Sequence, residues 1–283
     1  MYADYWGLSE IPFKNTIDLR WFYESPGHEE ALARLLFLIE QHRRCGVLWG
    51  PSGTGKSLIL ELLRREAARN GGAIALIDVL GHGSREMLWD LLAGLGLAPA
   101  IDDSQFRLWR MLHDHVLANR HAQAPLVLVL DHLDRAQADC LAAVERLQQF
   151  SAGGQTGLTL ILGVTSERAG GHAQMLRDIS DLRIDLAGLD REQTQQYVES
   201  LLERAGAARP LFGATAFDRL FDETRGVPRE VNRLCDLALL AGMADQVPQI
   251  DESIIAAAAE ELHVRLPAAR PVRRFGERFV AGI

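Results

Sequence analysis

The sequence predicts an α/β fold, a parallel sheet flanked by helices, followed by a small all-helical lid domain. Over the first two thirds of the chain, short apolar runs alternate with segments of helical spacing. Strands separated by helices predict a parallel sheet that is covered on both faces. From about residue 190 the apolar runs end and only helical patterns follow. We therefore predict four segments: an aromatic-rich N-terminal segment (1–28), an α/β core (29–188), a helical lid (189–263) and a basic C-terminal tail (264–283).

The individual elements follow from the same patterns. Strands are expected at 46–50, 73–79, 126–131, 158–164 and 182–186. Core helices are expected at 28–43, 57–69, 84–95, 104–120 and near 172–180, and another follows the strand at 126–131 and ends at residue 150. Lid helices are expected at 190–206, 214–224, 227–242 and 251–263. The aromatic residues of the N-terminal segment are expected to pack against another part of the chain.

Composition restricts the class of protein. The 283 residues are 48% hydrophobic and 24% charged, as in ordinary globular proteins. The formal net charge of −8 argues against nucleic-acid binding by the whole surface, although a local basic patch stays possible. Three distant cysteines, Cys45, Cys140 and Cys235, indicate buried thiols in a reducing compartment. With no signal-peptide pattern and no apolar run of membrane-spanning length, we expect a soluble, cytoplasmic protein.

One motif indicates nucleotide chemistry. The run "GPSGTGKS" follows a short apolar strand and precedes a helix, and it matches G-x-x-x-x-G-K-[ST]. This is the loop of P-loop NTPases, in which glycines let successive N–H groups surround an anion and the helix N-terminus adds positive potential. Lys56 is expected to contact the β- and γ-phosphates, and Ser57 to ligate magnesium. The predicted nucleotide-binding residues are Gly50, Pro51, Ser52, Gly53, Thr54, Gly55, Lys56, Ser57 and Leu58.

A second part of the site is expected at "LVLVLDHLD". Asp131 ends a buried strand, where its carboxylate is predicted to hold magnesium. The alternative is an N-cap for the following helix, a role that Asp134 could serve equally well. The long stretch of chain between Lys56 and Asp131 favours one branch of P-loop proteins. In that branch another strand lies between the strand that precedes the P-loop and the strand that ends in the aspartate. His132 follows Asp131, where many ATPases have a glutamate that helps to activate water.

Several stretches resemble the ExeA (GspA) branch of AAA+ ATPases, which is related to the transposition ATPases of the TniB and TnsC kind. They are "YWGL…PF", "FYESPGHEEALARLLFLIE", the P-loop, "YVESLLERAGA" and "GVPREVNRLCDLALLAG", and the resemblance covers about residues 1–262. It implies a Walker A and Walker B core and a helical lid, with ATP bound between them. It also implies assembly into rings or filaments with sites at the subunit contacts.

The resemblance also assigns roles to polar residues. Arg229, in the "GVPR" segment, is expected to reach the γ-phosphate from the lid, the alternative being a surface arginine at a helix start. Thr165 or Ser166 is expected to sense the γ-phosphate, the alternative being an N-cap. Arg177, or else Arg183, is expected to act on the site of a neighbouring subunit, although a solvated surface charge is the alternative for either one.

The function predicted from these features is ATP binding, with the nucleotide state controlling self-assembly and contact with a protein partner. The predicted catalytic residues are Lys56, Asp131, His132, Arg229 and Arg177, with ATP and Mg²⁺ as cofactors. Hydrolysis is expected to be slow because a neutral imidazole at His132 can accept a hydrogen bond from water but carries no negative charge. Two alternatives stay open: an adaptor that binds ATP without hydrolysing it, and a DNA-binding transposition regulator that uses the arginine-rich tail or a ring interior.

Three other histidines attract attention and are set aside. His113 and His115 are two residues apart on an expected helix, so they point in different directions and cannot share a metal ion. His82 stands between two glycines and is expected in a solvated loop. Trp109, Leu112 and Val116 have the spacing of a buried helix face rather than of a base-stacking surface.

Overall fold

The computed structural model describes residues 2–150, 158–168, 170 and 172–262. In this part of the chain, five parallel strands form one sheet in the order β2-β3-β4-β1-β5. The strands are β1 (Cys45–Gly50), β2 (Ala73–Asp78), β3 (Leu126–Asp131), β4 (Leu158–Thr165) and β5 (Leu182–Asp185). Because β4 lies between β1 and β3, the predicted extra strand between the two motif strands is confirmed.

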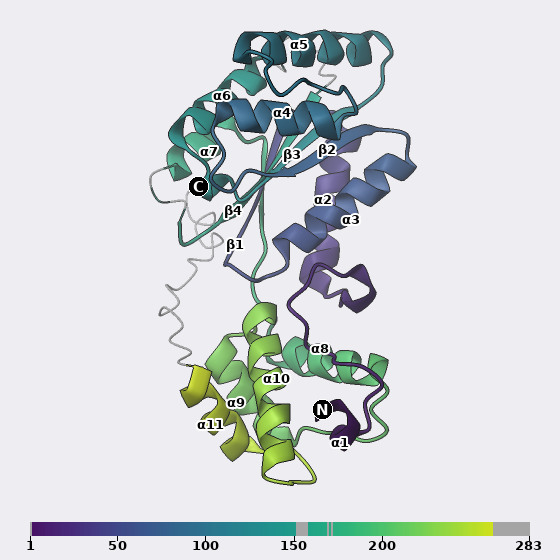
Figure 1. Cartoon of the computed structure of the whole chain (residues 1–283), viewed down its shortest axis with the longest axis vertical. Helices are drawn as coiled ribbons and strands as arrows, with labels where there is room; N and C mark the ends of the chain where they lie inside the picture. The colour runs from purple at the N-terminus through teal and green to yellow at the C-terminus, as the bar shows by residue number, and fades with distance from the viewer. Residues whose placement is uncertain (1, 151–157, 169, 171, 263–283) are drawn as a thin grey trace, which may run out of the picture.

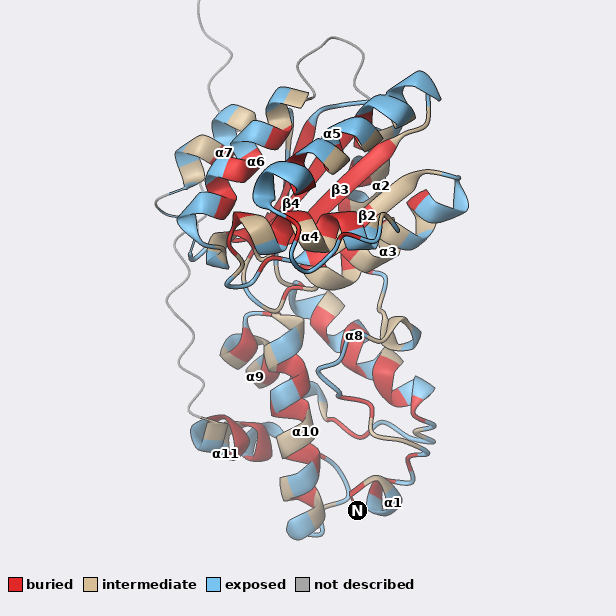
Figure 2. Ribbon diagram, turned by 45° about the horizontal axis from the view of Figure 1, so that its top comes forward, coloured by how far each residue is buried: buried red, intermediate tan, exposed pale blue. Residues whose placement is uncertain are grey.

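Helices cover both faces of the sheet (Figure 1). On one face lie α2 (Pro26–Glu40) and α3 (Lys56–Arg69); on the other lie α4 (Ser84–Gly94), α5 (Gln105–His121), α6 (Ala138–Phe150) and α7 (Ala173–Ile179). Every residue of β1, β3 and β4 is buried, which explains why these strands read as continuous apolar runs (Figure 2). The predicted α/β class is therefore confirmed.

Local signals set the starts of several helices. Ser25 caps α2 and accepts from the His28 N–H, and proline occupies the first position of that helix. Ser104 caps α5 in the same way. At the start of α8, Asp190 and Gln193 form a capping box. These caps satisfy N–H groups that have no partner within their own helix.

The second lobe is helical (Figure 1). It contains α8 (Arg191–Arg204), α9 (Ala214–Thr224), α10 (Pro228–Ala244) and α11 (Glu252–Leu262), which enclose their own apolar core. The short helix α1 (Tyr2–Trp6) packs into that core, and the Trp6 indole N–H donates to the Leu239 carbonyl at 2.9 Å. Most of the N-terminal aromatics therefore pack in the helical lobe, while Phe22 packs against His28 of α2. The division of the chain into four segments stays a prediction.

The linker from β5 to the helical lobe packs closely against the turn between α9 and α10. The Leu189 N–H donates to the Gly226 carbonyl at 2.8 Å, and Gly226 has φ +66°. A Cβ placed on Gly226 would lie 1.8 Å from the Leu189 carbonyl oxygen. Glycine is therefore required at this junction both for its backbone angle and for the space.

Two remaining expectations concern the thiols and the membrane. Cys45, Cys140 and Cys235 are buried and free, as predicted. Burial raises the pKa of the Cys45 and Cys140 thiols to about 12. Among the described residues, no helix combines the length and the apolar character needed to cross a bilayer. The tail at 264–283, which the DNA-binding alternative invokes, lies outside the described residues.

Candidate nucleotide-binding site

The P-loop connects β1 to α3 and turns through two glycines with left-handed backbone angles. Gly53 has φ +86° and Gly55 has φ +100°, and α3 begins at the next residue. The backbone N–H groups of Gly53, Thr54 and Gly55 donate to no acceptor among the described residues, although Thr54 is fully buried. Buried N–H groups without an acceptor are rare in proteins. Together with the N-terminus of α3, they form a cradle that suits a phosphate.

Lys56 lies along this loop. Its ammonium donates to the carbonyls of Gly50 and Pro51, in each case at 2.8 Å. The residue is only 6% exposed. Burial lowers the pKa of Lys56, and the negative charge of Asp131 opposes that effect. A buried ammonium that has only carbonyl partners is well placed to take an anionic ligand.

Ser57 and Asp131 lie together at the carboxyl edge of the sheet. The Ser57 hydroxyl donates to Asp131 Oδ2 at 2.5 Å, although the two residues are 74 positions apart. Hydroxyl and carboxylate oxygens are hard ligands of the kind that Mg²⁺ prefers. The donor set therefore fits a magnesium ion bound by these two side chains and by phosphate oxygens.

The N-cap interpretation is wrong for both aspartates that follow β3. Asp131 accepts from Ser57 and from the His132 N–H, at 2.5 and 2.8 Å. Asp134 lies in the 3-10 helix η2 (Leu133–Arg135) and accepts from the Thr165 N–H at 2.8 Å. The two carboxylates thus contact the P-loop helix and the end of β4, because the sheet brings these strand ends together.

His132 has a left-handed backbone, with φ 58° and ψ 35°. Its side chain is 28% exposed, and its Nδ1 lies 3.0 Å from Asp78 Oδ1 at the end of β2. The same Nδ1 lies 3.7 Å from Asp131 Oδ2. The imidazole therefore lies beside the Ser57–Asp131 pair and bonds to a carboxylate of the neighbouring strand. Sequence reasoning missed Asp78, whose only signal is its place at the end of an apolar run.

Arg229 reaches the P-loop from the start of α10. Its N–H donates to the Gly53 carbonyl at 3.2 Å, and its guanidinium donates to the Ser52 hydroxyl at 3.1 Å. A Cβ placed on Gly53 would lie 2.7 Å from the Arg229 Cβ. Although the Arg229 side chain is exposed, the helical lobe presents it to the loop that is predicted to bind phosphate.

His28 was not singled out from the sequence, yet it supports the P-loop from the other side. It is buried, its Nε2 lies 3.0 Å from the Thr54 carbonyl, and its Nδ1 lies 2.6 Å from the Ser25 hydroxyl. A carbonyl only accepts, so Nε2 carries the proton and Nδ1 accepts from Ser25. Burial lowers the pKa of His28. The available signal was a histidine three residues after a helix-capping serine.

The other predicted residues lie at different places around the site. Thr165 is buried at the end of β4, and the Ser166 N–H donates to the Gly50 carbonyl at 3.1 Å. Arg183 lies 4.7 Å from the Trp49 ring centroid and pairs with Asp185 at 2.6 Å within its own chain. Arg177 is exposed on α7 and donates to Gln174 at 3.0 Å, with no ion pair to any described residue. Of these two arginines, only Arg183 has an ion pair with a described residue, so the guanidinium of Arg177 is the more available for a contact with another subunit.

The histidines that were set aside remain outside the site. His113 packs edge-on against Phe150, with 5.4 Å between the ring centroids, and His115 lies on the same helix, α5. His82 lies in the loop between β2 and α4, as expected, but its side chain is only partly exposed and its Nε2 bonds to Asp90 at 2.8 Å. Burial is the largest influence and lowers the pKa of His82, but the hydrogen bonds to Asp90 and Leu80 and the charges of Asp90 and Asp78 together raise that pKa. The described residues hold no cluster of three metal-ligating acidic, histidine or cysteine side chains.

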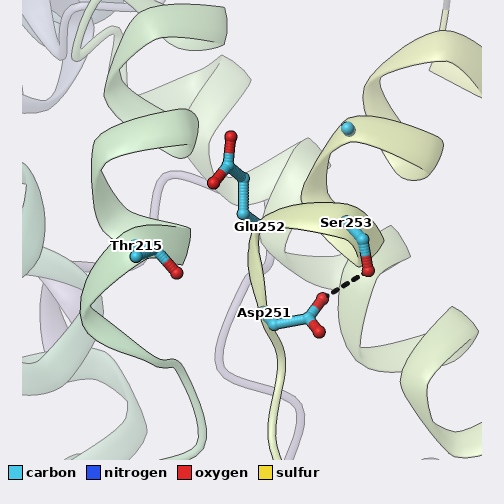
Figure 3. A pocket seen from close by; sticks show the side chains of 5 residues that line it. Thr215, Asp251, Glu252 and Ser253 are labelled. Carbon is cyan, nitrogen blue, oxygen red and sulfur yellow. Dashed lines mark hydrogen bonds between the residues drawn. The ribbon is translucent and has the colours of Figure 1, made fainter.

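A pocket in the helical lobe lies apart from these residues (Figure 3). It is lined by Thr215 at the start of α9 and by Asp251, Glu252, Ser253 and Ala256 at the start of α11. The Ser253 hydroxyl donates to Asp251 at 2.7 Å. Both groups therefore bond within the chain, and the pocket adds nothing to the nucleotide site.

Comparison with known proteins finds an AAA domain in the α/β part of the chain. Residues 39–169 match the family model described as AAA domain. Over 266 residues the chain is 27% identical to general secretion pathway protein A of Aeromonas hydrophila. The match covers 93% of this chain, which spans about half of the relative (48%).

Solved structures share the fold at low identity. Cdc6p of Pyrobaculum aerophilum has a TM-score of 0.67 at 17% identity, covering 90% of this chain and 74% of that one. The ORC2 protein of Aeropyrum pernix has a TM-score of 0.61 at 15% identity, covering 89% and 72%. Residues 39–169 therefore match an AAA domain, and the chain is similar to general secretion pathway protein A over most of its length.

Proposed function

We propose that this protein binds ATP with magnesium between the P-loop and the helical lobe, and that the bound nucleotide controls self-assembly and contact with a protein partner. The observation that carries the proposal is the Ser57–Asp131 pair beside three P-loop N–H groups that have no acceptor among the described residues. The ORC2 protein of Aeropyrum pernix, which shares the fold, was solved as ADPNP–ADP complexes. That relative supports adenine nucleotides as the ligand.

Each residue has a defined task in this proposal. Magnesium bound to ATP would neutralise phosphate charge, and Ser57 and Asp131 would hold it. Lys56 would exchange its two carbonyl partners for phosphate oxygens. Arg229 would add a second positive charge from the helical lobe, next to Ser52. These residues position the phosphates and stabilise charge, which are the main sources of catalysis in phosphoryl transfer.

Hydrolysis is proposed to be slow because His132 follows Asp131. A glutamate at this position would bring negative charge close to the attacking water and accept its hydrogen bond. A neutral imidazole accepts the hydrogen bond without that charge. Positioning by the other residues then leaves a low but measurable turnover. If ATP binds with no turnover at all, the protein is instead an ATP-gated adaptor.

Self-assembly is proposed to place Arg177 at the nucleotide site of a neighbouring copy. Its guanidinium projects from α7, is exposed and has no ion pair among the described residues. Binding of the γ-phosphate by a second subunit would couple the nucleotide state to assembly. DNA binding is the rival proposal, and the net charge of −8 gives it no support.

The test compares Lys56→Ala with Arg65→Ala on the same helix. Arg65 is exposed and pairs with Glu61, so its loss should leave the site intact. In calorimetric titration with ATP and Mg²⁺, we expect Lys56→Ala to lose detectable binding, because charged hydrogen bonds contribute about 1.5–3 kcal/mol each. Light scattering with a slowly hydrolysed ATP analogue should detect assembly in Arg65→Ala and none in Lys56→Ala. Undiminished ATP affinity in folded Lys56→Ala protein would contradict the proposal.

A further inference from the structure

The ends of β2 and β3 form a pair of acidic residues. Asp78 and Asp131 are the last residues of these strands and lie opposite each other in the sheet register. Asp131 faces Ser57, whereas the Asp78 carboxylate lies 3.0 Å from His132 Nδ1. The Asp78 carboxylate therefore contacts His132, the residue at the position where many ATPases have a glutamate, and among the described residues it forms no hydrogen bond with the Ser57 hydroxyl or the Asp131 carboxylate.

We propose that Asp78 is a positioning residue that fixes the proton of His132 on Nδ1 and leaves Nε2 as a hydrogen-bond acceptor for water. The role of Nε2 as an acceptor for the attacking water rests on the proposed ATP hydrolysis, whereas the position of the proton on Nδ1 does not. A carboxylate only accepts hydrogen bonds, so the nitrogen that bonds to it must carry a proton. Nε2 has no hydrogen-bond partner in the described part of the chain. A neutral imidazole in water prefers the opposite tautomer, so the protein has to impose this one.

Backbone contacts hold both members of the pair. Asp78 Oδ1 also accepts from the Leu80 N–H at 3.0 Å, which fixes the carboxylate against its own turn. The His132 N–H donates to Asp131 Oδ1 at 2.8 Å, and the left-handed backbone of His132 places its side chain next to β2. Histidine is one of the few residues other than glycine that adopt this backbone readily. The imidazole is thus held by two neighbouring strand ends.

Exposure argues that the contact positions the ring rather than stabilising the fold. The Asp78 side chain is 56% exposed and that of His132 28%. Exposed pairs contribute little to folding stability. By contrast, a carboxylate that selects the tautomer of a neighbouring histidine decides which ring nitrogen is able to accept a hydrogen bond from water.

The direct test is the ¹⁵N spectrum of the imidazole in the full-length protein without nucleotide, recorded where the imidazole ¹⁵N shifts no longer change as the pH rises. Comparison with His132→Gln assigns the signals. We expect a protonated Nδ1 and an unprotonated Nε2 in the native protein and in Asp78→Asn, because the amide oxygen also accepts. Asp78→Leu should move the proton to Nε2. Asp90→Leu, which removes the similar His82 pair, should leave His132 unchanged.

Turnover provides the second measurement. Asp78→Leu should lower kcat for ATP about 10-fold, the low end for loss of a group that orients a functional histidine. KM for ATP should be unchanged, and Asp78→Asn should retain most of the rate. A native His132 with its proton on Nε2, or an equal rate in Asp78→Leu and native protein, would overturn the proposal. If native protein has no turnover, the proposed hydrolysis fails, and the ¹⁵N spectrum alone decides the role of Asp78.

Discussion

The two halves of the candidate site are held in place by different parts of the molecule. The P-loop is contacted by His28 at the start of α2 and by Arg229 at the start of α10. The end of β3 is contacted by residues of the strands beside it, Asp78 from β2 and Thr165 from β4. One half therefore depends on how the helical lobe and α2 meet the P-loop, and the other on the neighbouring strands and on Ser57 of α3.

This difference separates two kinds of control. Strand register fixes the end of β3, because β3 and β4 are buried along their whole length and cannot slip without burying polar groups. The P-loop lies at the junction of the lobes, which meet through a few backbone contacts. Changes at the junction should therefore affect the P-loop contacts, and changes at the ends of β2 and β3 should affect the chemistry of the site.

The largest effect is expected from Gly226→Ala at the lobe junction. The new Cβ would lie 1.8 Å from the Leu189 carbonyl oxygen, so the backbone that brings Arg229 to the P-loop has to shift. The left-handed backbone alone costs alanine about 1–2 kcal/mol. With the clash added, we expect the free energy of unfolding to fall by about 4 kcal/mol, at the upper end for single substitutions. Urea denaturation measures it.

Gly71→Ala is the matched control. Gly71 has φ +77°, close to that of Gly226, but no atom lies within 4 Å of a Cβ placed there. It should lose only the backbone contribution, about 1–2 kcal/mol. Equal losses in the two variants would mean that the close contact between Leu189 and Gly226 is not maintained in solution.

A smaller effect is expected from His132→Glu. A carboxylate beside the attacking water should raise ATP turnover about 10-fold, the low end for a positioned general base. Since the variant places two carboxylates next to each other, the double variant with Asp78→Asn should be faster than the single one. Steady-state phosphate release measures both. The slow-hydrolysis proposal is wrong if native protein turns over at about 1 per second or faster and His132→Glu adds nothing.

The smallest effect concerns His28 and pH. Its pKa is lowered by burial from the ordinary value of 6.5, so the unfolded chain takes up a proton first as the pH falls. The free energy of unfolding should therefore decrease from pH 6.5 down to the folded pKa and level off below it, by at most about 1.4 kcal/mol per pH unit. Denaturation of native and His28→Gln protein between pH 8 and 5 measures the difference. A constant difference over that range would show that His28 titrates normally.

Much of the fold was predictable because its signals are local. Continuous apolar runs marked the strands, helical spacing marked the helices, and the sequence between Gly50 and Ser57 contained both the glycines and the lysine of the P-loop. Asp131 was also identifiable, since it ends an apolar run. Such features depend on neighbouring residues, and burial on both faces of the sheet leaves a clear pattern.

Tertiary structure alone decided which side chains meet. The Asp78–His132 contact spans 54 positions and the Arg229–Ser52 contact 177, so neither has a periodic signal in the sequence. Asp134 illustrates the limit: it has the residue type of a helix cap, yet it bonds to the Thr165 N–H because β3 and β4 are neighbours in the sheet. The residues of the P-loop follow from the sequence, whereas the groups that support it and the environment of His132 depend on strand order and on the packing of the two lobes.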